Sequence, residues 1–288
     1  MTTKHLDFTS FKWLSLPAVI VLAIGFFTIT SASSLQAQTT AATQSGSMTE
    51  VKPVVDLSAQ HQLYRDQVEN YRQKHKAYVI AKDQFKAHET LASIEAAVNA
   101  TREVMLARQQ VLISYLELLQ LELQQTHGIE LTHKQAAETS ISALIVELKL
   151  YQDLVKQSNN RQQLQERTSE FSDLAEQLKA TGYYTLSLLK LGQLQNVYDQ
   201  TIALKIDLVE QVLADQTELE PAKQRAVAET EQFLSTVDQE LKNQWTQLDN
   251  KQIKQINSNF YQQLTKKLNP VYADLAKSLS YLEELLNL

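Results

Sequence analysis

The stretch from residue 104 to residue 123, VMLARQQVLISYLELLQLEL, is apolar at 13 of its 20 positions. One helical stripe runs from Met105 to Leu123 and a second runs beside it from Val104 to Leu118, which leaves only a thin polar line. A helix that is apolar over most of its circumference must be covered on several sides. We therefore predict a central helix here, with other helices packed around it.

The rest of the chain has very few turn-forming residues. From residue 55 onward it contains three glycines and two prolines, and the space between them is rich in Leu, Gln, Ala, Lys and Glu, which favour helix. Helices of about 30 to 50 residues joined by short turns are typical of an elongated bundle. The sequence predicts an all-α fold, an elongated antiparallel helical bundle or coiled coil of about five to six helices.

The N-terminal segment has the order of a secretory signal. Lys4 and Lys12 precede a largely apolar run over residues 13–29, and small residues follow as far as Ala37. We predict a signal peptide over residues 1–37, a flexible linker over 38–54 and a helical-bundle domain over 55–288. These segments predict an extracytoplasmic protein that is secreted, periplasmic or held at the cell surface.

The alternative for the N-terminal segment is an uncleaved membrane anchor. Cleavage after Ala32 or after Ala37 fits the small-residue zone, although neither position is an ideal cleavage site. The apolar run is at the short limit for crossing a bilayer and is interrupted by Pro17. If the segment is retained, it would provide the only membrane contact that we expect.

Charge and cysteine content exclude several classes of function. The formal net charge is −6, and it becomes −7 without residues 1–37. A mildly acidic body is unsuited to nucleic acid or to anionic lipid surfaces. Because the chain has no cysteine, its stability must come from packing, with no disulfide and no thiolate chemistry.

Residues 56–88 follow a heptad spacing with tyrosine at three successive repeats. We interpret this seam as an ordinary helix–helix contact, although an aromatic ladder for a partner helix or a glycan is the alternative. Two histidines in the seam could make it sensitive to pH near 6.5. The seam positions are Leu57, His61, Tyr64, Val68, Tyr71, His75, Tyr78, Lys82 and Phe85.

Helix boundaries can be placed from capping residues. Thr90 is expected to cap the helix that contains the central stretch, and Gly128 to end that helix in a left-handed conformation. Thr132, with Gln135 three residues later, has the form of a capping box for the next helix. Residues 158–160, Ser-Asn-Asn, mark the boundary after it.

The C-terminal half is predicted to hold further helical segments. Gly182 either ends a helix or lies inside one, and an apolar helix from Tyr184 onward is expected to be the main neighbour of the central helix. Thr217 and Pro221 form a further start signal.

From Pro221 to Leu268 the pattern fits one helix of about 48 residues, with Asn250 as the most plausible kink. Asn269-Pro270 then reads as the start of the last helix.

Catalytic chemistry is not recognisable in the sequence. His127, Glu130 and His133 have metal-ligand spacing, but the Glu-x-x-His pattern occurs once and spans a predicted turn, so solvated turn residues are the better interpretation. Asn99 fits a glycosylation pattern inside a predicted helix, which we attribute to chance. We predict no catalytic, cofactor-binding or metal residues, no cofactor and no enzyme activity.

These observations favour a non-enzymatic exported protein of the cell surface or envelope that acts as scaffold, spacer or protein-binding module. Its partner would be another protein, or a second copy, that packs on a helical seam. A ligand sensor or chaperone with a groove between helices is the first alternative. A membrane-active, pore-forming type of protein that releases residues 104–123 is the second, although Arg108, Glu117 and Glu122 are costly in a bilayer.

Overall fold

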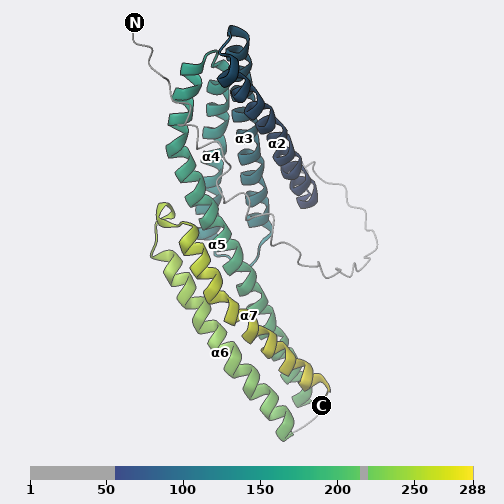
Figure 1. The fold of residues 1–288 in the computed structure, drawn as a ribbon. Coiled ribbons are helices and arrows are strands. Elements are labelled where there is room, and N and C mark those ends of the chain that lie inside the picture. The colour runs from purple at the N-terminus through teal and green to yellow at the C-terminus, as the bar shows by residue number, and fades with distance from the viewer. Residues whose placement is uncertain (1–55, 215–219, 288) are drawn as a thin grey trace, which may run out of the picture. The chain divides into compact units, whose positions relative to one another are not determined.

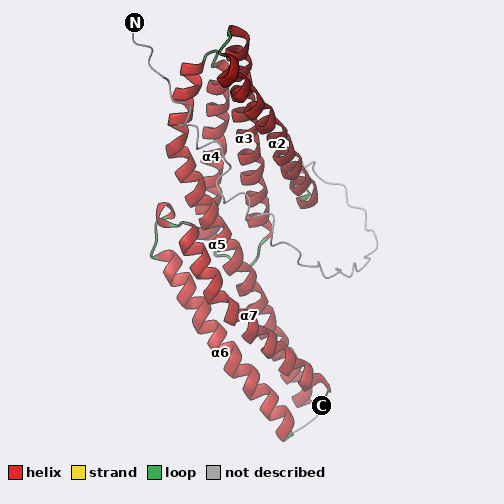
Figure 2. Ribbon diagram, in the orientation of Figure 1, coloured by secondary structure: helices red, strands yellow, loops and turns green. Residues whose placement is uncertain are grey.

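The computed structural model describes residues 56–214 and 220–287, and within these ranges every regular element is helical (Figure 2). The chain divides into two units, Met1–Asp56 and Leu57–Leu288. The predicted signal peptide and linker therefore lie outside the described residues. The second unit is the all-α, elongated arrangement of helices that the sequence predicts (Figure 1).

The unit contains six α-helices and one short 3₁₀-helix in its described residues. In chain order they are α2 (Leu57–His88), α3 (Leu91–Gln125), α4 (Leu131–Gln157), α5 (Arg161–Ala214), α6 (Pro221–Asp249), η2 (Ile253–Gln255) and α7 (Ser258–Asn287).

The central-helix prediction is confirmed by α3, which packs against α2, α4 and α5. Val104, Met105 and Leu123 are 0% exposed, and even Ser114 of the polar line is fully buried. Three neighbouring helices therefore bury the apolar surface of α3, which extends around most of its circumference.

The prediction that the apolar helix from Tyr184 onward is the main neighbour of the central helix is wrong. The most extensive neighbour of α3 is α2, whose tyrosines Tyr64, Tyr71 and Tyr78 are all buried. The tyrosine seam is therefore a helix–helix contact within the bundle. Large rings give α2 enough buried area to dock closely despite its polar surroundings.

The longest helix, α5, spans 54 residues, or about 80 Å at 1.5 Å per residue, and runs straight through Gly182. It packs on α3 and α4 and also on α6 and α7. Figure 1 shows α2, α3 and α4 beside the first part of α5, and α6 and α7 beside its second part. Helix α5 therefore belongs both to a four-helix part, formed by α2, α3, α4 and α5, and to a three-helix part, formed by α5, α6 and α7.

The predicted 48-residue helix does not form, because the chain reverses near Asn250. Helix α6 ends at Asp249 with Asn250 as its cap, and α7 begins at Ser258. The buried side chain of Ile256 anchors the connection, and Asn257 Oδ1 accepts a hydrogen bond from Phe260 N at 3.1 Å.

The predicted helix start at Asn269-Pro270 is also wrong, because Pro270 lies inside α7. With the reversal already made twelve residues earlier, the apolar stripe of α7 continues past the proline on α5 and α6.

The capping predictions succeed in part. Thr90 caps α3 as predicted, and the structure adds a capping box with Ser93; the boundary at 158–160 is also confirmed. Gly128 has a φ of +79°, but it lies beyond the actual cap, Thr126. The predicted capping box at Thr132 is wrong, since α4 begins at Leu131 with Glu130 as its N-cap residue. The start signal at Thr217 lies outside the described residues.

Candidate functional site

The loop between α3 and α4 lies flat on α5 because two glycines meet there. A Cβ on Gly128 would lie 2.4 Å from the carbonyl oxygen of Gly192, and a Cβ on Gly192 would lie 2.3 Å from Cγ1 of Ile129. Only glycine allows backbones to approach so closely. The contact fixes the start of α4 against the middle of α5, and so fixes the position of His133.

His133 does not join His127 and Glu130 in a metal site. Its Nε2 lies 3.0 Å from Oδ1 of Asp249 on α6, and its Nδ1 lies 3.3 Å from the hydroxyl of Tyr184 on α5. Among the described ranges, 56–214 and 220–287, no three His, Cys, Asp or Glu side chains are grouped so that they could hold a metal ion.

The His133 contact joins α4, α5 and α6. A carboxylate can only accept, so Nε2 donates to Asp249; in the neutral ring Nδ1 then accepts from the Tyr184 hydroxyl, and in the protonated ring Nδ1 donates to it. The imidazole also stacks on the Trp245 ring, with centroids 5.6 Å apart and 22° between the planes.

The order carboxylate, imidazole, hydroxyl resembles a proton relay. However, burial, and secondarily the charge of Asp249, raise the pKa of the Tyr184 phenol, and its side chain is buried. A relay that activates a nucleophile needs an accessible hydroxyl whose pKa is lowered. The arrangement therefore serves to tie three helices together.

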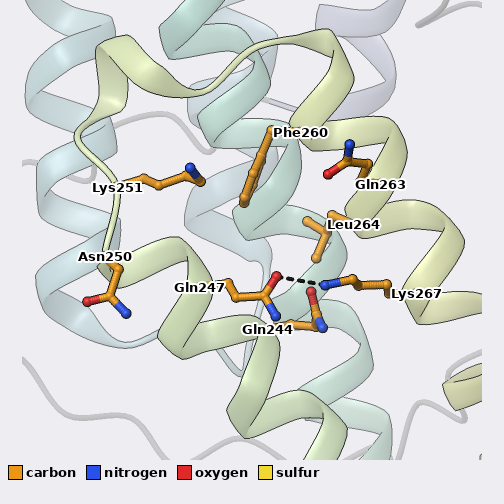
Figure 3. Close-up of a pocket in the computed structure, with 8 residues that line it drawn as sticks. All are labelled: Gln244, Gln247, Asn250, Lys251, Phe260, Gln263, Leu264 and Lys267. Carbon is orange, nitrogen blue, oxygen red and sulfur yellow. Dashed lines mark hydrogen bonds between the residues drawn. The ribbon is translucent and has the colours of Figure 1, made fainter.

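A pocket of about 260 Å³ lies next to this contact, between the end of α6 and the start of α7 (Figure 3). We call it the hairpin pocket. Its lining residues are Gln244, Gln247, Asn250, Lys251, Phe260, Gln263, Leu264 and Lys267.

The floor and the rim of the hairpin pocket differ in character. Gln244 and Leu264 are buried, whereas Lys251 and Lys267 are exposed. Lys267 Nζ donates to Oε1 of Gln247 at 2.9 Å, the bond drawn in Figure 3, and Lys251 Nζ lies 5.7 Å from the centre of the Phe260 ring. The pocket thus combines two cations, four carboxamides and one aromatic ring, with no carboxylate in its lining.

No direct signal for this pocket exists in the sequence, because the pocket depends on the reversal at residues 250–257. One indirect signal exists. Between residues 241 and 273 the chain has five lysines and a single acidic residue, Asp249, although the whole chain has a net charge of −6. This part of the chain is therefore locally cationic in an acidic protein.

Two histidines of the tyrosine seam have different surroundings. His61 Nε2 lies 3.4 Å from Oε1 of Glu122, whereas His75 lies between the rings of Tyr71 and Tyr78. Burial raises the pKa of Glu122 to about 7. Burial, with a smaller contribution from Arg65, lowers the pKa of His61.

Deeper in the bundle, an arginine is surrounded by aromatic rings. The guanidinium carbon of Arg108 lies 4.0 Å from the centre of the Phe171 ring, and Tyr151 packs on Phe171 at 5.3 Å. Arg108 is 3% exposed, so it faces the interior and not solvent. We interpret it as a cation–π contact that fixes α3 against α5.

An apolar surface lies on α4, opposite the side that faces the core. Val146, Leu150 and Leu154 recur every four residues and are 57%, 62% and 43% exposed. We call these three residues the α4 ridge. Residues four apart lie one above the other on a helix, so the α4 ridge is a continuous strip about 12 Å long.

Comparisons with protein-family models, with curated proteins and with solved structures found no match for this chain. In the described ranges, none of the helices combines the length and the apolar character needed to cross a membrane.

Proposed function

We propose that this chain is a non-enzymatic helical-bundle protein of the cell surface or envelope that binds another protein through the α4 ridge. The observation that carries the proposal is the exposure of Val146, Leu150 and Leu154 on a helix whose opposite side is buried at Leu144, Leu148 and Val155. An apolar strip at helical spacing is the feature by which one helix recognises another.

The charges beside the ridge select the partner. Glu147 and Asp153 are exposed and lie on either side of the strip, about 60° around the helix from Leu150. In a pair of identical α4 helices, parallel or antiparallel, these acidic flanks would meet acidic flanks. We therefore expect the occupant to be an amphipathic helix of a different protein, with Lys or Arg beside its apolar face.

A photo-crosslinking amino acid at Leu150 of the full chain tests this assignment in the native envelope. We expect a specific crosslinked protein whose crosslinked peptide is an amphipathic helix with basic flanks. The same probe at Lys149, an exposed neighbour off the ridge, is the matched control. A crosslink to a second copy of this chain, or equal yields at both positions, would refute the assignment.

A substitution separates binding from folding. Leu150→Glu should abolish capture of the crosslinked partner, while Lys149→Glu should leave it intact, and both should keep the thermal stability of the parent because both positions are exposed. Loss of capture by both variants would place the contact elsewhere.

Export can be tested independently of the partner. Residues 1–37 fused to alkaline phosphatase should give an active enzyme, because that reporter needs disulfides that form outside the cytoplasm. An inactive fusion that is present at normal abundance would contradict the extracytoplasmic part of the proposal.

A ligand sensor is the second candidate, and the hairpin pocket is the observation that favours it. A membrane-active function is less well supported, because release of α3 into lipid would transfer the buried side chain of Arg108 with it.

A further inference from the structure

We infer that the hairpin pocket binds a sugar acid, that is, a single ring that carries hydroxyl groups and one carboxylate. This inference develops the sensor candidate and goes beyond the scaffold function, since it makes no use of the α4 ridge. It rests on the charge, the lining and the size of the pocket.

The charge of the pocket favours an anion. Lys251 and Lys267 line it, and no lining residue is acidic. The nearest carboxylate in sequence, that of Asp249, is engaged by His133 at 3.0 Å. Its two lysines can therefore act on a ligand without competition from an acid in the same lining.

The helix ends at the pocket add little to this charge. Gln247 and Asn250 come from the C-terminal end of α6, whereas Phe260 comes from the first turn of α7. The negative end of one helix dipole faces the positive end of the other, so the two largely cancel. The preference for an anion then comes from two lysines, which suits a singly charged carboxylate better than a phosphate dianion.

The lining provides the groups that recognise a hydroxylated ring. The carboxamides of Gln247, Asn250 and Gln263 each offer a donor and an acceptor, as hydroxyl groups do. Phe260 and Leu264 give an apolar surface, and the negative face of a phenyl ring attracts the C–H groups of a sugar ring.

The size of the pocket limits the ligand to one ring. Its volume of about 260 Å³ is just below the range of roughly 300 to 1,000 Å³ that is usual for drug-sized ligands. Because the rim is exposed, the ring can be a free sugar acid or the terminal residue of an acidic polysaccharide.

Titration of the full chain with glucuronate, glucose and acetate tests the inference. Ligand-observed NMR at concentrations up to about 10 mM detects such weak binding. We expect glucuronate to bind at least tenfold more tightly than glucose, which lacks the charge, and than acetate, which lacks the ring. A di-uronate that binds as well as glucuronate would indicate the end of a polysaccharide, and a weaker one would indicate a free sugar acid.

Matched lysine variants assign the site. Lys251→Gln should lower the affinity for glucuronate about tenfold, because it removes one charge-assisted contact. Lys266→Gln changes the same charge next to a lining residue but outside the lining, so it should leave the affinity unchanged. Lys251 is exposed, so neither variant should alter the thermal stability.

Three results would overturn the inference: no binding of glucuronate at the highest concentration, equal binding of glucose and glucuronate, or an equal loss in Lys251→Gln and Lys266→Gln. Failure here is distinct from failure of the scaffold function, because crosslinking at Leu150 does not involve the hairpin pocket.

Discussion

The two glycines of α5 have opposite surroundings. A Cβ on Gly182 would meet no atom within 4 Å, whereas one on Gly192 would collide with Ile129. Glycine inside a helix destabilises it by about 0.5–1 kcal/mol relative to alanine. Gly182→Ala should therefore stabilise the protein by about that amount, as measured by urea denaturation.

The matched substitution at the second position should have the opposite sign. Gly192→Ala must displace Ile129 and the loop that holds His133, and overpacking of this kind typically costs about 1–3 kcal/mol. If Gly192→Ala leaves the stability unchanged or raises it, the close approach of the loop to α5 would be refuted.

Glu122 makes the stability depend on pH. Burial raises its pKa from 4.5 to about 7. Between these values the folded protein holds a proton that the unfolded chain has released, so stability falls as pH rises through this window. His61, whose pKa is lowered, contributes with the opposite sign at pH values below 6.5.

Glu122→Gln isolates the carboxyl group, because the amide keeps the shape and cannot ionise. The variant should match the parent near pH 4.5 and be more stable by about 2–3 kcal/mol at pH 7.5. The measurement is the free energy of unfolding at several pH values, with His75→Gln in the tyrosine seam of α2 as a control. Parallel pH curves for Glu122→Gln and the parent would contradict the assignment.

At the scale of elements, α7 continues through Pro270, which removes one backbone hydrogen bond and crowds the preceding turn. Proline inside a helix costs on the order of 3 kcal/mol, and neighbouring structure reduces this cost. Pro270→Ala should stabilise the protein by about 1–3 kcal/mol and raise its melting temperature. A lower melting temperature would show that the proline ring contributes packing that outweighs the lost bond.

The sequence predicts the bounds of a helix where local signals, such as a capping residue, determine them. It does not predict them where contacts between distant residues determine them. The all-α fold, the extent of α2 and the start of α3 follow from periodicity and from Thr90. The reversal at Asn250 does not, because the seam repeats on both sides of it and the packing of α6 against α7, which accompanies the reversal, is a long-range contact.

The candidate site was harder to predict than the fold for the same reason. The sequence drew attention to His133 through its neighbours His127 and Glu130, yet its partners are Asp249 and Tyr184, at least fifty residues away. The hairpin pocket depends on the reversal, so its lining could not be assembled before the turn was known.

At the scale of the whole unit, stability is expected to be uneven. The four-helix part surrounds α3, whose Leu116 is 1% exposed, whereas the far end of the three-helix part has a small core of Leu208, Ala226, Leu282 and Leu285. A part of the bundle with fewer buried residues has a lower free energy of local opening.

Native-state hydrogen exchange should therefore show amides of α6 and of the end of α7 opening at a lower free energy than amides of α3. Leu116→Ala should cost about 3–5 kcal/mol and lower the protection of α3, as expected for a fully covered leucine. Equal opening energies in α3, α6 and α7 would instead indicate a single cooperative unit.

Helix α5 is shared by both parts and is unbroken across all of its 54 residues. A rod without a joint transmits a tilt from one end to the other with little loss, since bending it would stretch hydrogen bonds along its whole length. If the hairpin pocket closes on a ligand and shifts the end of α6, the His133 contact connects that shift to α5 and to the first turn of α4. A ligand in the hairpin pocket would then change the position of α4, the helix that carries the α4 ridge. Helix α5 would connect these two otherwise separate surfaces.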